Sequence, residues 1–206
     1  MILAIEGPSA AGKTTWCRSH CPHSWVGEAP YHILAPDLYA DPAEVAEFWV
    51  NHNAANWQRA LELEQAHGIA VCDGDPLHLY FSWALWKSGA LDARLLAIER
   101  ELYRDAFSQQ RMGFVDFVLW LEAPEDELRR RARADTVRKR KRQEIYLALA
   151  PWMKVWFAAR EKILPGSMRP LNGNFRLEDL AVDASPRRYA LGLFSEMLDR
   201  LHSTGN

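Results

Sequence analysis

The chain has 206 residues, 49% of them hydrophobic and 25% charged, with a formal net charge of −2. This is the composition of an ordinary globular protein that can bury a full core, so neither a structural metal nor a disulfide is required. The three cysteines lack the spacing of metal ligands and suit a reducing compartment. The apolar start, Met1–Ile5, is too short for a signal peptide, and no stretch is long enough for a membrane span. We therefore expect a cytoplasmic protein with no membrane contact.

The first part of the chain alternates between strand and helix patterns. Met1–Ile5 is a nearly continuous apolar run that ends before a glycine, which is typical of a central parallel strand covered on both faces. A helix is expected over Lys13–His20, and a weaker strand over Tyr31–Ala35. Asp41 can cap a long helix that runs over Pro42–His67 and is closed by a glycine.

The middle of the chain continues this alternation. Ile69–Cys72 predicts a third strand, which ends at the carboxylate of Asp73. Helices are expected over Pro76–Lys87 and Asp92–Met112, separated by a Ser-Gly turn. A fourth strand is expected over Phe114–Leu121.

The last part contains two more helices, over Pro124–Ala134 and Lys141–Ile163, and then a segment rich in Pro, Gly and Asn, Leu164–Arg176, that predicts a loop. Leu180–Val182 is the expected fifth strand, and Pro186–His202 is an amphipathic helix. Strands that alternate with helices in this way predict an α/β domain with a parallel sheet.

The segment Gly7–Thr14 reads Gly-Pro-Ser-Ala-Ala-Gly-Lys-Thr and matches the phosphate-binding pattern G-x-x-x-x-G-K-[ST]. Its glycines allow the main chain to turn so that successive N–H groups point at phosphate oxygens, and the following helix adds its positive end. Lys13 is expected to contact the β- and γ-phosphates, and the Thr14 hydroxyl to bind Mg²⁺. The residues expected to bind the nucleotide here are Gly7, Ser9, Ala10, Ala11, Gly12, Lys13, Thr14 and Thr15.

A strongly basic segment lies between Arg129 and Arg142, where nine Lys or Arg residues accompany one acid. Three interpretations are open: a solvated helix face, a clamp for phosphate, or a nucleic-acid patch. Arg129 and Arg133 are four residues apart and share a helix face. Because a phosphate-binding loop is also present, we favour the clamp, with both arginines stabilising the charge of the transferred phosphoryl group.

In three blocks the chain resembles the thymidylate kinase and deoxynucleoside kinase group. The first block is Ile2–Thr15, which contains the phosphate loop. The second is Gly68–Asp75, a strand that ends in an acidic residue. The third is Pro124–Arg133, which is similar to the arginine-rich lid of that group. The segment Asp183–Pro186 stands where the group has its adenine-side loop.

This resemblance implies a nucleotide-kinase-like P-loop fold in one domain, with three layers, about five parallel strands, helices on both faces, and a lid over residues 124–146. It implies ATP and Mg²⁺ as cofactors, with Arg129 and Ser185 also contacting the nucleotide. The chain departs from the group at Gly74, where the group has an arginine that contacts the acceptor. A neutral hydroxyl acceptor is therefore favoured over an acceptor with its own phosphate.

Two carboxylates are candidates for the base that takes the proton of the acceptor hydroxyl. Asp73 ends the third predicted strand, at the edge of a parallel sheet where α/β sites form, and it is also a candidate ligand of Mg²⁺. Asp37 ends the second predicted strand and resembles the base of antibiotic and shikimate kinases. Asp75 is a close rival of Asp73.

The leading hypothesis is a kinase that uses ATP to phosphorylate a hydroxyl of a small molecule, most plausibly a nucleoside or nucleotide-like metabolite. The alternatives are an antibiotic-modifying O-phosphotransferase and a P-loop switch that acts on a protein or nucleic-acid partner. Nucleic acid is disfavoured as a partner, and the assembly is left open, with a homodimer as one candidate.

Overall fold

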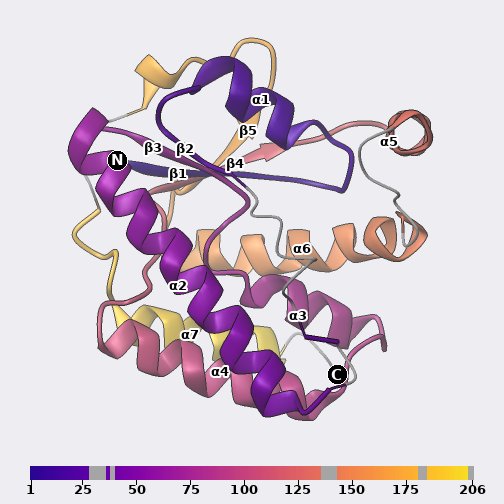
Figure 1. The fold of residues 1–206 in the computed structure, drawn as a ribbon, viewed down its shortest axis with the longest axis vertical. Helices are drawn as coiled ribbons and strands as arrows, with labels where there is room; N and C mark the ends of the chain where they lie inside the picture. Colours follow the sequence, from indigo (N-terminus) through magenta and orange to yellow (C-terminus); the bar gives the residue numbers. More distant parts are fainter. Residues whose placement is uncertain (28–35, 38–39, 136–142, 181–184, 204–206) are drawn as a thin grey trace.

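A parallel sheet lies at the centre of the molecule (Figure 1). The computed structural model describes residues 1–27, 36–37, 40–135, 143–180 and 185–203. The order of the five strands in the sheet is β2-β3-β1-β4-β5. In chain order these strands are β1 (Ile2–Glu6), β2 (Trp25–Val26), β3 (Ala70–Asp73), β4 (Phe117–Leu121) and β5 (Met168–Leu171).

The central position of β1 follows from its composition. All five residues of Ile2–Glu6 are buried, so the strand is covered on both faces. It pairs in parallel with β3 and β4, with Ile5 opposite Asp73 and Glu6 opposite Trp120. Because these strands run in the same direction, the residues that follow them meet at one edge of the sheet.

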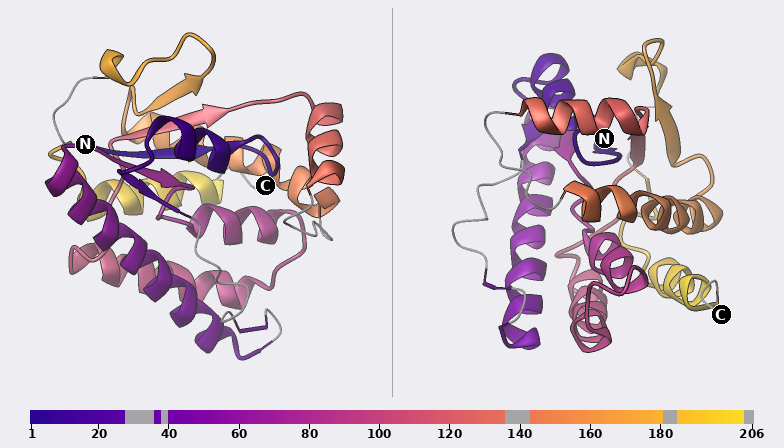
Figure 2. Two further views of the ribbon diagram at one scale, coloured as in Figure 1. Left: turned by 45° about the horizontal axis from the view of Figure 1, so that its top comes forward. Right: turned by 90° about the vertical axis from the view of Figure 1, so that its right-hand side faces the viewer.

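Helices cover both faces of the sheet, as the alternating side chains of β1 show. Leu3 and Ile5 belong to the cluster that packs against α1, whereas Ile2 and Ala4 belong to the larger core shared with the other helices. Figures 1 and 2 show α1 on one side, and α2, α3, α4, α6 and α7 stacked on the other. The described helices are α1 (Lys13–His20), α2 (Pro42–His67), α3 (Leu79–Lys87), α4 (Ala93–Ser108), α5 (Glu125–Ala134), α6 (Gln143–Ile163), α7 (Leu191–Ser203) and the short 3₁₀ helix η2 (Leu177–Asp179).

The ends of α2 are set by local chemistry. The Asp41 carboxylate accepts a hydrogen bond from Ala43 N–H, and Pro42 occupies the first helical position. Gly68 closes the helix in the left-handed conformation, with φ +75°. The predicted ends of this helix and of α1 agree with the structure.

The fifth strand was predicted in the wrong place. The strand beside β4 is β5, Met168–Leu171, which lies inside the predicted loop Leu164–Arg176. It is a short edge strand with two exposed residues, and it contains a proline, which an edge position tolerates. Its sequence therefore lacks an apolar run. Leu180, the first residue of the predicted strand, lies in a bend, and the other two residues lie outside the described part of the chain.

The second predicted strand, Tyr31–Ala35, also lies outside the described residues. The strand that pairs with β3 is the two-residue β2. The last predicted helix, Pro186–His202, begins later than expected, at Leu191. No helix within the described ranges combines the length and apolarity needed to cross a membrane.

Gly7 follows β1 and lies against the end of β4. Its φ of +145° belongs to the region that glycine alone adopts easily, and a Cβ placed on it would lie 2.1 Å from the carbonyl oxygen of Leu121. No described atom lies within 4 Å of the corresponding point on Gly173.

We expect Gly7→Ala to lower the free energy of unfolding by about 2 kcal/mol or more, because backbone strain and overpacking act together. Gly173→Ala, the matched control, should change it little. Urea denaturation of both variants measures the difference. Equal effects would show that the contact with Leu121 does not constrain residue 7.

Candidate active site

The loop between β1 and α1 has the geometry of an anion-binding turn. Gly12, at φ +106°, precedes the first residue of α1, and Ala10 also has a positive φ, of 69°. The turn is closed by a hydrogen bond from Ala11 N–H to the Pro8 carbonyl, at 3.2 Å. Main-chain N–H groups that curl over a helix N-terminus in this way form a phosphate site.

Lys13 spans this loop. Its Nζ donates to the carbonyl of Gly7 at 2.8 Å and to that of Pro8 at 3.3 Å. The ammonium is therefore held at the loop itself, where it supplies positive charge beside the main-chain N–H groups.

Thr14 and Asp73 are brought together by the pairing of β1 with β3. The Thr14 hydroxyl donates to Asp73 Oδ2 at 2.5 Å, which joins the start of α1 to the end of β3. A hydroxyl and a carboxylate are the hard oxygen ligands that Mg²⁺ prefers, together with water and phosphate oxygens. The described residues contain no group of three or more His, Cys, Asp or Glu that could hold a metal without such help.

Glu6, which the sequence analysis did not select, lies under the phosphate loop. It is fully buried, and its Oε1 accepts from Asp75 N–H at 2.6 Å, while Oε2 accepts from Gly7 N–H at 3.4 Å. Burial raises its pKa to about 7, although Lys13, Asp75 N–H and the Tyr80 hydroxyl favour the charged form. The sequence could have indicated the importance of Glu6, because an acidic residue ends an otherwise apolar strand.

Asp75, the rival of Asp73, is buried and has partners within the fold. It is 2% exposed, lies 3.8 Å from the buried guanidinium of Arg160, and accepts from Leu77 N–H at 3.0 Å. Burial raises the pKa of Asp75 and lowers that of Arg160, and each charge partly offsets this for the other. Asp73 is only half-buried at the same strand end.

Asp37 is exposed, and its carbonyl accepts a hydrogen bond from Ala40 N–H at 2.9 Å. The strand that it was expected to end lies outside the described residues. Gly74 has φ +95° and lies beside Glu6 and Tyr80, since a Cβ on it would be 3.7 Å from Glu6 Oε1 and 3.9 Å from the Tyr80 hydroxyl.

The lid contacts the phosphate loop through residues other than those expected. Arg131 Nη1 donates to the Ala11 carbonyl at 2.8 Å, and the Gln143 side chain lies 3.2 Å from the Ser9 hydroxyl. Arg129 instead forms ion pairs with Glu125 and Glu144, the latter at 2.8 Å.

Arg133 lowers the pKa of Glu144 after the larger effect of Arg129. Figure 2 shows α5 beside the start of α6, at the end of the molecule where β1 turns into α1.

A groove of about 600 Å³ adjoins the phosphate loop. It is bounded by α1, the end of β4 and the segment that follows β5, and Leu121, which contacts Gly7, is part of its wall. The ring of Trp16 stacks on that of His20 with centroids 4.5 Å apart. The lining residues are Trp16, His20, Trp120, Leu121, Glu122, Pro170, Leu171, Asn172, Gly173 and Phe175.

Ser185, predicted beside the nucleotide, lies elsewhere in the structure. Its N–H donates to Asp116 Oδ1 at 2.8 Å, and Asp116 immediately precedes β4, at the opposite edge of the sheet from the phosphate loop. The prediction followed from the resemblance, which puts the adenine-side loop of the kinase group at Asp183–Pro186. β5 ends at Leu171. The segment that follows it, at the edge of the sheet where the phosphate loop lies, is therefore 172–175.

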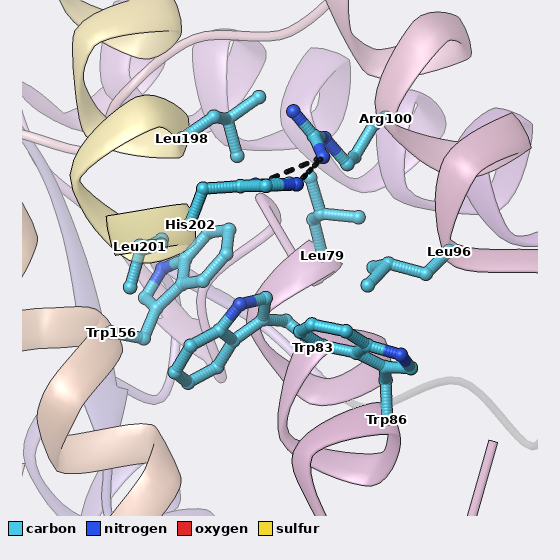
Figure 3. Close-up of a pocket in the computed structure, with 9 residues that line it drawn as sticks. All are labelled: Leu79, Trp83, Trp86, Leu96, Arg100, Trp156, Leu198, Leu201 and His202. Carbon is cyan, nitrogen blue, oxygen red and sulfur yellow. Dashed lines mark hydrogen bonds between the residues drawn. The ribbon is translucent and has the colours of Figure 1, made fainter. Parts of the chain in front are cut away.

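Two tryptophans of the helical layer, Trp57 on α2 and Trp83 on α3, belong to the core. Trp57 and Trp83 are 1% and 4% exposed. A second cavity beside Trp83 has a volume of about 10 Å³, which is room for roughly one water (Figure 3). It is lined by Leu79, Trp83, Trp86, Leu96, Arg100, Trp156, Leu198, Leu201 and His202.

No protein-family model and no curated protein matches the chain. Three solved structures of a deoxyadenosine kinase from M. mycoides do match it. The structure with the products dCMP and a flexible dCDP is 14% identical with a TM-score of 0.58, that with dCTP is 13% identical at 0.58, and that with dATP is 13% identical at 0.60. Each match covers 98% of this chain and 100% of the kinase chain. The chain therefore has the fold of these kinases, and the predicted α/β P-loop fold is confirmed.

The burial of Glu6 predicts a pH dependence of stability. Because its pKa is about 7 in the folded chain and 4.5 without burial, the folded chain binds more protons between these pH values. The free energy of unfolding should therefore fall as the pH rises from about 4.5 to 7, by an amount on the order of 3 kcal/mol from this group.

Urea denaturation at pH 5 and pH 8 measures this loss. In Glu6→Gln, which cannot ionise, the difference between the two pH values should be smaller than in the wild type. Glu101→Gln, an exposed change on α4, is the control and should leave the difference unchanged. An undiminished difference in Glu6→Gln would contradict the assignment.

Proposed function

We propose that the protein is a kinase that transfers the γ-phosphoryl group of ATP to a hydroxyl of a nucleoside-like small molecule. The observation that carries this proposal is the hydrogen bond between Thr14 and Asp73, beside a loop spanned by Lys13. This arrangement combines an anion site, a pair of oxygen ligands suited to Mg²⁺, and a carboxylate at the sheet edge where acceptors bind in α/β folds.

The donor nucleotide would lie along the phosphate loop, with its base in the groove between Trp16 and the segment 172–175. The groove supports this because its wall continues into the loop at Leu121, and its aromatic lining suits a planar base. Thr14 and Asp73 would hold Mg²⁺, which neutralises charge on the phosphates when it is bound.

The acceptor hydroxyl would lie near Asp73. Its oxygen attacks the γ-phosphorus, the bond from that phosphorus to the bridging oxygen of ADP breaks, and the hydroxyl proton passes to a carboxylate. Asp73 is the half-buried carboxylate at this position, whereas Asp75 is buried and forms an ion pair with Arg160. Gly74 offers no cation to an acceptor phosphate, which favours an uncharged acceptor.

The lid would supply the remaining positive charge. Arg131 contacts the loop at Ala11, so among the lid arginines that the structure describes it is the one placed to meet the phosphates. Arg129, which the sequence pattern favours together with Arg133, is paired with Glu125 and Glu144 and would reach the phosphates only by exchanging these partners. We therefore assign the first charge contact to Arg131.

A screen of nucleosides, nucleotides and aminoglycoside- or phenicol-like compounds tests the proposal. ATP consumption should require an acceptor, and it should be strongest with a nucleoside. Lys13→Ala should lower turnover by about 10²-fold or more, because the ammonium stabilises transferring charge. Lys162→Ala, on the exposed last turn of α6, is the matched control. Acceptor-independent hydrolysis would favour the switch, and turnover of the drug-like compounds alone would favour the antibiotic-modifying enzyme.

The base assignment gives a separate prediction. Asp73→Asn should lower kcat by about 10²–10⁴-fold on the identified acceptor, because the amide cannot accept the hydroxyl proton. Asp37→Asn should leave kcat near the wild-type value. Steady-state kinetics of both variants measures this, and a larger loss in Asp37→Asn would move the base to that residue.

A further inference from the structure

The first turn of α6 connects the phosphate loop to the lid helix α5. Gln143, the first residue of α6, faces the loop: its Oε1 accepts a hydrogen bond from the Ser9 hydroxyl at 3.2 Å, and its Nε2 lies 3.5 Å from the Ser9 carbonyl oxygen. Glu144, the next residue, accepts two hydrogen bonds from the guanidinium of Arg129 on α5, at 2.8 and 3.2 Å. Two consecutive residues therefore contact the loop on one side and the lid helix on the other.

The core holds the two helices to different degrees. α6 is fixed by apolar side chains such as Leu149 and Trp156, which are 0% and 1% exposed. Within α5, all of which the structure describes, Leu128 is the one buried residue. The place of α5 therefore depends on its polar contacts. The pair of Arg129 with Glu144 is exposed and has two parallel hydrogen bonds, so it contributes more to the orientation of α5 than to stability.

The contact of Gln143 with Ser9 can persist during a reaction at the loop. Arg131, on the same helix as Arg129, donates to the Ala11 carbonyl, and in the proposed function its guanidinium turns to the phosphates. The Gln143 amide is neutral, and it lies against the hydroxyl and the carbonyl of Ser9. It therefore leaves to the phosphates the main-chain N–H groups that form the anion site.

We propose that Gln143 is a positioning residue for phosphoryl transfer. By binding Ser9 it sets the place of the first turn of α6 relative to the phosphate loop. Through the pair of Glu144 with Arg129, it also sets the place of Arg131 on α5. This inference rests on the proposed function. A cation stabilises the transition state best when it is held in place beforehand, so a loosened α5 lowers kcat more than it weakens the binding of ATP.

Gln143→Ala tests the inference, because it removes the amide and keeps a residue that favours the helix. It should lower kcat by about fivefold, the effect of one hydrogen bond of ordinary strength. The KM for ATP should change by about twofold or less. Gln65→Ala, at an exposed glutamine of α2, is the matched control and should keep the wild-type kinetics. Steady-state kinetics with ATP and the acceptor found in the screen measures both constants.

A double-mutant cycle with Arg131→Ala separates positioning from a structural role. If Gln143 acts through Arg131, Gln143→Ala should lower kcat no further in a chain that already carries Arg131→Ala. A structural role would lower kcat by the same factor in both backgrounds. If urea denaturation shows that Gln143→Ala does not fold, Ser9→Ala removes the hydroxyl from the other side of the same contact and takes its place in the cycle.

An unchanged kcat in the folded variant, or independent effects of the two substitutions in the cycle, would overturn the inference and leave the kinase assignment intact. A wild type that consumes ATP equally with and without every acceptor in the screen would instead overturn the proposed function, and this inference with it.

Discussion

The hydrogen bond from Asp75 N–H to Glu6 joins the carboxyl ends of β1 and β3, and the geometry of the site depends on it. Glu6 also receives the N–H of Gly7, so one buried carboxyl group holds the first residue of the phosphate loop and the turn after β3. Thr14 and Asp73 are the half-buried counterpart of this junction. A polar group in a dry environment keeps a defined geometry because water offers no competing partner. The junction can therefore fix the distance between loop and carboxylate.

The two faces of the sheet have different surroundings near this junction. On the side of α1 lies the groove beside Trp16, lined by the ends of β4 and β5. On the other side, α2, α3 and α4 meet in a mainly apolar layer that contains the buried hydrogen bond from Asn53 to Tyr103. In the proposed function, the donor and the acceptor would approach the phosphate loop from opposite faces of this edge.

Local chemistry determined what the sequence could predict. The ends of α1 and α2, and the loop that includes Lys13, were predictable because caps, glycines and the phosphate motif act within a few residues. β5 was not, because an edge strand with an arginine and a proline has no apolar run. Ser185 was placed beside the nucleotide by resemblance alone, and the structure has its N–H bonded to Asp116. The sequence also could not show that Arg131, and not Arg129, contacts the phosphate loop. Helical spacing shows which residues share a face of the helix, but it does not show which face lies against the loop.

The contact between Gly7 and the end of β4 has a genetic consequence. The atom that excludes a side chain at position 7 is the main-chain oxygen of Leu121, which every amino acid would place there. No substitution at position 121 can make room, so a defect caused by Ala at position 7 has no suppressor at the residue that blocks it. Compensation would require the backbone of β4 to shift, and β4 is held between β1 and β5 by parallel pairing. The pairing of β4 in the sheet therefore prevents substitution of Gly7 by residues with a side chain.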